Sequence, residues 1–125
     1  MSEAVPKERA TFGRHERLTK DLEFQRAFER RKTASDGVLV VFAVENGLGR
    51  ARLGLSVGRR KIARATARNR FKRLVREAFR LNKEKLPKGV DLVVVPREPA
   101  PTFSAVQGSL VRLARDAARR LAPRG

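Results

Sequence analysis

The stretch ATARNRFKRLVREAFR, residues 65–80, narrows the choice of fold most, because it predicts a helix with two unlike sides. One side is an apolar stripe with the spacing i, i+3, i+4, i+7 and i+8, which is typical of a helix that packs on a core. That stripe consists of Phe71, Leu74, Val75, Ala78 and Phe79. The rest of the chain must therefore supply an apolar surface of similar length.

Three short apolar segments are typical of the strands that would form this surface. Residues 38–45 (VLVVFAVE) are rich in β-branched and aromatic side chains, and residues 90–96 (VDLVVVP) resemble a strand that is buried on both faces. Residues 52–58 (RLGLSVG) alternate between apolar and small or polar side chains. The turn ENGLGR predicts that 38–45 and 52–58 form an antiparallel hairpin, whereas the strand–helix–strand unit over 52–96 permits a parallel pair.

Two further amphipathic segments complete the predicted order of elements. One helix is expected to begin near Thr19, and another near residue 102 or 104, with its apolar stripe continuing to Leu121. A short edge strand fits within residues 32–37. We therefore predict an α+β fold, a two-layer α/β sandwich with about four strands and three helices. Residues 17–122 form the single domain, and residues 1–16 form a flexible basic N-terminal arm.

Charge indicates the class of partner. The chain has 30 basic and 13 acidic residues, a formal net charge of +17, and its 41% hydrophobic content is enough for a core. Such a charge favours nucleic acid first and an anionic membrane surface second. Residues 59–80 contain ten basic residues and a single acidic residue, Glu77. Like charges at i, i+4 destabilise a helix unless an external anion offsets them. Arginine forks suit phosphate groups, and Asn69, within this run, would either cap the helix or reach the nucleic acid.

The composition contains few residues that could form a catalytic or metal-binding site in the protein itself. There is no Cys, the single His is His15, and the four Asp residues are scattered, so we expect no catalytic constellation and no metal site. No apolar run is long enough to span a bilayer, and the start of the chain has no secretory h-region. We therefore expect a soluble cytoplasmic protein without a membrane partner.

Residues 67–79, ARNRFKRLVREAF, resemble the signature helix of the bacterial ribonuclease P protein subunit. Residues 54–70, 21–28 and 91–97 resemble the strand before that helix, the first helix and a later strand of the same family, so the resemblance covers about residues 15–121. It implies a sandwich whose strand–helix–strand crossover is left-handed. It also implies a role as partner of the catalytic RNA, which removes the 5′ leader of precursor tRNA. The RNA subunit with Mg²⁺ would do the chemistry, and the protein alone would be inactive and bind no cofactor.

The resemblance also implies two binding regions. The leader would lie in a cleft lined by Phe24, Phe28 and Phe42, although core packing is the plainer explanation for the first two. Gly54 and Ser56 are small and would leave room for a ligand over the sheet. The basic motif would contact the RNA subunit through Arg59, Arg60, Lys61, Arg64, Arg68, Asn69, Arg70, Lys72, Arg73 and Arg76.

The expected partners are thus ribonuclease P RNA and the precursor tRNA leader, in a ribonucleoprotein with one protein monomer. Sulfate or phosphate is expected on the basic face of the isolated protein. The main alternative is a structural RNA-binding protein of the ribosomal type. A DNA-binding helix and a protein-only nuclease are weaker alternatives, because a strand precedes the basic helix and the carboxylates are scattered.

Overall fold

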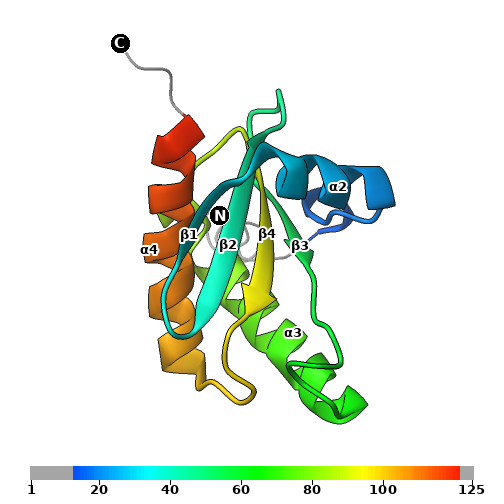
Figure 1. Ribbon diagram of the computed structural model, residues 1–125. Helices are drawn as coiled ribbons and strands as arrows, with labels where there is room; N and C mark the ends of the chain where they lie inside the picture. The colour runs from blue at the N-terminus through cyan, green and yellow to red at the C-terminus, as the bar shows by residue number, and fades with distance from the viewer. Residues whose placement is uncertain (1–12, 122–125) are drawn as a thin grey trace.

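The computed structural model describes residues 13–121, which form one four-stranded sheet with helices on both faces (Figure 1). The predicted α+β fold is confirmed. The structure adds that α2 lies on the opposite face of the sheet from α3 and α4. The elements are η1 (Arg14–Glu16), α2 (Asp21–Arg30), β1 (Lys32–Ser35), β2 (Leu39–Glu45), β3 (Arg52–Leu55), α3 (Ala65–Leu81), η2 (Lys83–Lys85), β4 (Val90–Pro96) and α4 (Phe103–Leu121).

The strand order is β1-β2-β4-β3, so β4 separates the two strands that the sequence predicts as a hairpin. β2 is antiparallel to both β1 and β4, and β3 is parallel to β4. The predicted hairpin of 38–45 with 52–58 is therefore wrong, whereas the parallel pair within 52–96 is confirmed. The physical reason is burial: six of the seven residues of β4 are buried, and a position between β2 and β3 pairs both edges of this strand while helices cover its two faces.

The connection from β3 through α3 to β4 is left-handed. Figure 1 shows both strands running in the same direction, with β3 at the right-hand edge and α3 behind the sheet. Most parallel crossovers have the opposite hand. The left-handed crossover brings α3 to the same face as α4 and leaves the other face of β3 to α2.

The main core lies between the sheet and the two long helices. The apolar stripe of α3 contributes Phe71, Val75 and Phe79, each at most 1% exposed, and they pack with Val41 and Leu92 of the sheet. Burial of one such side chain stabilises the fold by about 1.5–3 kcal/mol. The predicted stripe of α3 is thus confirmed as its core-facing side.

A smaller cluster lies on the opposite face, beneath α2. Its buried members are Leu18, Ala27, Val44 and Val93, and the half-buried Phe24, Phe28, Phe42 and Val95 pack against them. Gly54 of β3 lies under this cluster. A Cβ atom on Gly54 would lie 2.8 Å from the Phe24 ring and 2.9 Å from Leu18. Phe24 and Leu18 therefore occupy part of the room predicted above Gly54, and Gly54 also lines the hollow that remains beside them.

The described chain begins within the predicted arm. Residues 14–16 form η1, where Glu16 is buried, accepts a hydrogen bond from the backbone N–H of Gly13 (2.7 Å) and pairs with Lys83 (2.7 Å). These residues are therefore part of the domain. The remainder of the predicted arm, residues 1–12, and the terminal residues 122–125 lie outside the described residues. Within residues 13–121, no helix is both long and apolar enough to cross a membrane.

We expect Gly54→Ala to destabilise the protein by about 1–3 kcal/mol, because the added methyl group overpacks the contact with Phe24. Urea unfolding measures the change. Gly108→Ala is the matched control: nothing lies within 4 Å of its added Cβ, and alanine replaces glycine inside α4. It should stabilise the protein by about 0.5–1 kcal/mol. Equal effects of the two substitutions would contradict this account of the α2–β3 contact.

Candidate nucleic-acid interface

The basic side of α3 extends from its outer surface to the β3 edge of the sheet. Arg73 is exposed, whereas Lys72 and Arg76 are half-buried and line a hollow beside β3. Arg76 and Lys72 are one helical turn apart, which places them on the same flank of α3. The predicted motif therefore does not form one uniform surface.

The hollow beside β3 has a volume of about 180 Å³ and two chemically different sides. Arg17, Lys72 and Arg76 supply positive charge, and the Phe24 ring together with Leu18 supplies apolar surface. The pKa of Arg76 is lowered by its burial and by the charge of nearby Arg17. No carboxylate is among the described residues that line this hollow. The positive charges of Lys72 and Arg76, which line the same hollow, would be stabilised by an anion such as a phosphate.

The three predicted aromatic residues gather in one cluster. Phe28 of α2 and Phe42 of β2 meet edge to face, with 4.8 Å between ring centroids and an interplanar angle of 85°. Phe24 belongs to the same cluster and also reaches the hollow beside β3. All three rings are half-buried. The cluster thus combines core packing with ring surface at the edge of a cationic hollow.

Arg68 and Arg70 of the motif have contacts within the protein. Arg68 donates hydrogen bonds to the carbonyls of Ile62 (3.1 Å) and Ala63 (2.7 Å), which fixes the loop before α3 to the helix. Arg70 donates to the carbonyl of Pro101 (3.4 Å), before the start of α4. These two arginines position α3 in addition to adding charge.

Asn69 is exposed in the second turn of α3, which begins at Ala65 with Arg64 at the cap position. Asn69 is therefore not a helix cap, and of the two predicted roles only contact with a partner is compatible with this position. The loop before α3 is anchored by Ile62, which is 2% exposed. The four basic side chains of this loop are exposed: Arg59, Arg60, Lys61 and Arg64.

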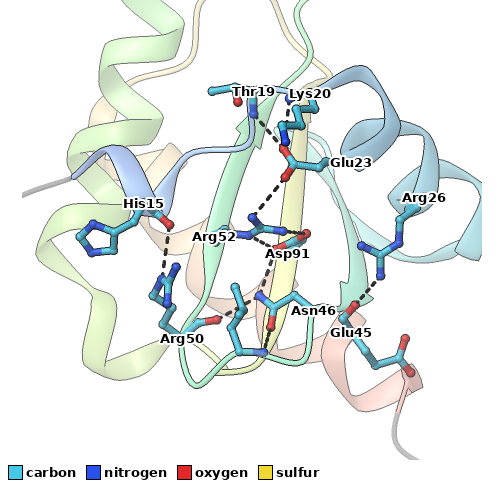
Figure 2. Close-up of polar contacts among 11 residues, drawn as sticks. His15, Thr19, Lys20, Glu23, Arg26, Glu45, Asn46, Arg50, Arg52 and Asp91 are labelled. Carbon is cyan, nitrogen blue, oxygen red and sulfur yellow. Dashed lines mark hydrogen bonds and ion pairs between the residues drawn. The ribbon is translucent and has the colours of Figure 1, made fainter.

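A buried polar network, which the sequence analysis missed, fixes α2 against the sheet (Figure 2). Asp91 of β4 is completely buried and accepts two hydrogen bonds of 2.8 Å from Arg52 of β3. Arg52 also donates to Glu23 of α2 at 3.2 Å, and the Asn46 side-chain amide donates to Asp91 at 3.0 Å. The only signal in the sequence was an aspartate inside the apolar segment VDLVVVP.

The network and the start of α2 together stabilise the charged form of Glu23. Burial alone would raise the pKa of Glu23, but hydrogen bonds from the backbone N–H groups of Lys20 and Thr19, together with the charge of Arg52, lower it. The hydrogen bonds that Arg52 donates to Asp91, together with the negative charges of Asp91 and Glu23, raise the pKa of Arg52. Because Phe24 follows Glu23 directly, this network sets the place of the Phe24 ring at the hollow.

Comparison with known proteins identifies the family. The family model for ribonuclease P matches residues 12–118. The chain belongs to the ribonuclease P protein family. It is 42% identical over 105 residues to the ribonuclease P protein component of Methylococcus capsulatus, which covers 84% of this chain and 81% of the relative. It is 46% identical over 88 residues to the component from Thermotoga maritima, covering 70% and 74% of the two chains.

Solved structures of ribonuclease P proteins share the fold. The Thermotoga maritima protein superimposes with a TM-score of 0.71 at 38% identity, covering 80% of this chain and 96% of that one. The Staphylococcus aureus protein gives a TM-score of 0.70 at 30% identity, covering 80% and 93%. The chain is thus the protein subunit of the ribonuclease P holoenzyme, whose other subunit is ribonuclease P RNA. This holoenzyme matures the 5′ end of tRNA. This membership replaces the ribosomal-type alternative.

We expect acid to weaken the fold partly through Glu23. Its folded-state pKa lies below the ordinary value of 4.5, so its stabilising contribution is present above that pH and is lost as the pH falls through the folded pKa. Glu23→Gln should make the free energy of unfolding less dependent on pH below 4.5. Asp36, Glu45 and Glu77, whose pKa values are also lowered, would keep part of the dependence.

Urea unfolding of both proteins over a series of pH values checks this expectation. Glu29→Gln, an exposed substitution on the same helix, is the control and should retain the full dependence. An unchanged dependence in Glu23→Gln would show that the network contributes nothing through this carboxylate.

Proposed function

We propose that the hollow beside β3 and the aromatic cluster next to it bind the single-stranded 5′ leader of precursor tRNA. The observation that supports this is the meeting of Lys72, Arg76 and Arg17 with Phe24 in one hollow. Single-stranded RNA is bound by basic grooves combined with aromatic surfaces. The cations would hold a leader phosphate, and the ring surface of the cluster would contact a base.

In the same proposal, the outer side of α3 and the loop before it contact the RNA subunit. Arg59, Arg60, Lys61, Arg64, Asn69 and Arg73 are exposed there, and the first turn of α3 carries no acidic residue. Cations at a helix N-terminus oppose the helix dipole, so this arrangement is stabilised by an external polyanion. Arg68 and Arg70 would contribute charge while holding the surface in place.

In this proposal, the RNA subunit with Mg²⁺ catalyses the cleavage of the leader. The protein would supply no catalytic group and bind no cofactor of its own, and it would act as a monomer paired with one RNA in the cytoplasm. A surface of this charge would also bind sulfate or phosphate when the RNA is absent.

The proposal is tested with Phe24→Leu in the reconstituted holoenzyme. Stacking on an aromatic ring is worth about 1–3 kcal/mol per base, so the affinity for leader-bearing precursor tRNA should fall about 5- to 150-fold. The affinity of the protein for the RNA subunit should stay unchanged, because Phe24 lies apart from the outer side of α3. Equilibrium binding of labelled precursor tRNA and labelled RNA subunit measures the two affinities.

Phe103→Leu is the matched control, since Phe103 is also half-buried but packs on the main core at the start of α4. It should leave the affinity for the precursor unchanged. Equal losses in the two variants would indicate that only stability was affected. Unchanged precursor affinity in a folded Phe24→Leu variant would contradict the proposed leader site.

A further inference from the structure

A second basic groove lies between α4 and the segment that follows α3. It has a volume of about 630 Å³, more than three times that of the hollow beside β3, and the two share no lining residue. Figure 1 shows α4 at the opposite side of the molecule from α2 and β3. The charged side chains of the groove are Lys85, Arg112, Arg115, Asp116 and Arg119.

The groove has an excess of positive charge. Lys85, Arg112, Arg115 and Arg119 face two carboxylates: Arg119 pairs with Asp116, and Arg112 pairs with Asp36. The local balance is therefore 4 − 2 = +2. Arg115 and Arg119 are one turn apart on α4, and like charges at this spacing destabilise a helix. As on α3, the cations accumulate on a side of the helix that does not face the core.

The groove is held in shape by contacts between its two walls. Arg115 Nε donates a hydrogen bond to the backbone carbonyl of Lys85 at 2.8 Å, which ties α4 to η2. The Asn82 amide, which follows α3, donates to Gln107 of α4 at 2.9 Å. The Arg115 contact uses only Nε, and a guanidinium carries four further N–H donors. The guanidinium is thus oriented before any partner binds, which lowers the entropy cost of binding.

We propose that this groove binds the phosphodiester backbone of the RNA subunit, as a second contact separate from the one made by α3. The inference rests on the proposed function, in which α3 contacts the same RNA. Planar arginine forks match phosphate oxygens, and Ser104 and Gln107 add neutral polar groups beside them. Val111 is the one large apolar side chain among the described lining residues, which disfavours a protein partner, because protein interfaces have apolar centres.

One leader cannot occupy the hollow beside β3 and the groove at the same time. A leader held against Phe24 lies at the β3 edge, whereas the groove lies between α4 and the segment after α3, and Figure 1 shows α4 at the opposite side of the molecule from β3. A large folded RNA can pass over the outer side of α3 and continue to α4, because both helices cover the same face of the sheet. The groove therefore extends the surface available to the RNA subunit.

The test compares two double variants that each remove two positive charges. Arg115→Gln/Arg119→Gln removes cations of the groove, and Arg97→Gln/Arg120→Gln removes exposed arginines that do not line it. The affinity for the RNA subunit is measured over a range of salt concentrations. Loss of two phosphate contacts should make the slope of log K against log salt shallower by about 1.4–1.8 in the groove variant alone. Equal slopes in the two variants would overturn the proposal.

A second measurement does not depend on charge removal, and it uses the absence of cysteine from the chain. Ser104→Cys, at the rim of the groove, is labelled with a tethered iron chelate that generates hydroxyl radicals. We expect discrete cuts in the RNA subunit, and we expect different cuts from Glu29→Cys on α2, across the sheet. Cuts in precursor tRNA alone, or no cuts above background, would refute the RNA subunit as the occupant.

The outcomes also separate this inference from the proposed function. If the wild-type protein does not bind the RNA subunit, the proposed contact of α3 fails together with this one. If the wild-type protein binds with a strong salt dependence and the groove variant keeps the same slope, only the groove contact fails. Thermal melts of the variants show whether the loss of the hydrogen bond from Arg115 to Lys85 has affected folding.

Discussion

The bidentate pair between Arg52 and Asp91 is the interaction on which the arrangement of the site depends. Asp91 is a fully buried carboxylate in the central strand of the sheet, and an unpaired charge there would be strongly unfavourable. Arg52 neutralises it and at the same time reaches Glu23 in the first turn of α2. One guanidinium thus joins β3, β4 and α2, three elements that are distant in the sequence.

This junction explains how two kinds of surface come together at β3. The edge strand has α2 on one face and the main core with α3 on the other. Gly54 lets the Phe24 ring approach the backbone of β3, while Lys72 and Arg76 approach the same strand from α3. A narrow edge strand therefore brings aromatic surface and positive charge into one hollow, a combination suited to single-stranded RNA.

The sequence was sufficient for features that depend on local periodicity. The stripe Phe71, Val75 and Phe79 predicted both the existence of α3 and its core-facing side, and charge counting predicted its basic side. Resemblance to the family added the left-handed crossover and the aromatic cluster, which periodicity alone does not specify. The predicted helix over residues 65–80 is close to the observed α3, which ends at Leu81.

Features that depend on distant segments were missed or wrong. The hairpin prediction followed a local turn signal, which carries no information about β4 entering between β2 and β3. The Phe24 ring, which comes from thirty positions earlier in the chain, occupies part of the room predicted above Gly54. The position of Arg17 in the hollow depends on tertiary packing, and so does the buried ion pair between Asp91 and Arg52. Neither could be predicted from local sequence patterns.

Binding of the leader in the hollow beside β3 is tested most directly by varying the leader itself. The affinity of the wild-type holoenzyme is measured for mature tRNA and for precursors whose leaders lengthen one nucleotide at a time. We expect the affinity to rise over the first several nucleotides, as the leader reaches the hollow, and then to stay constant. A holoenzyme that binds mature tRNA and all precursors equally well would contradict it.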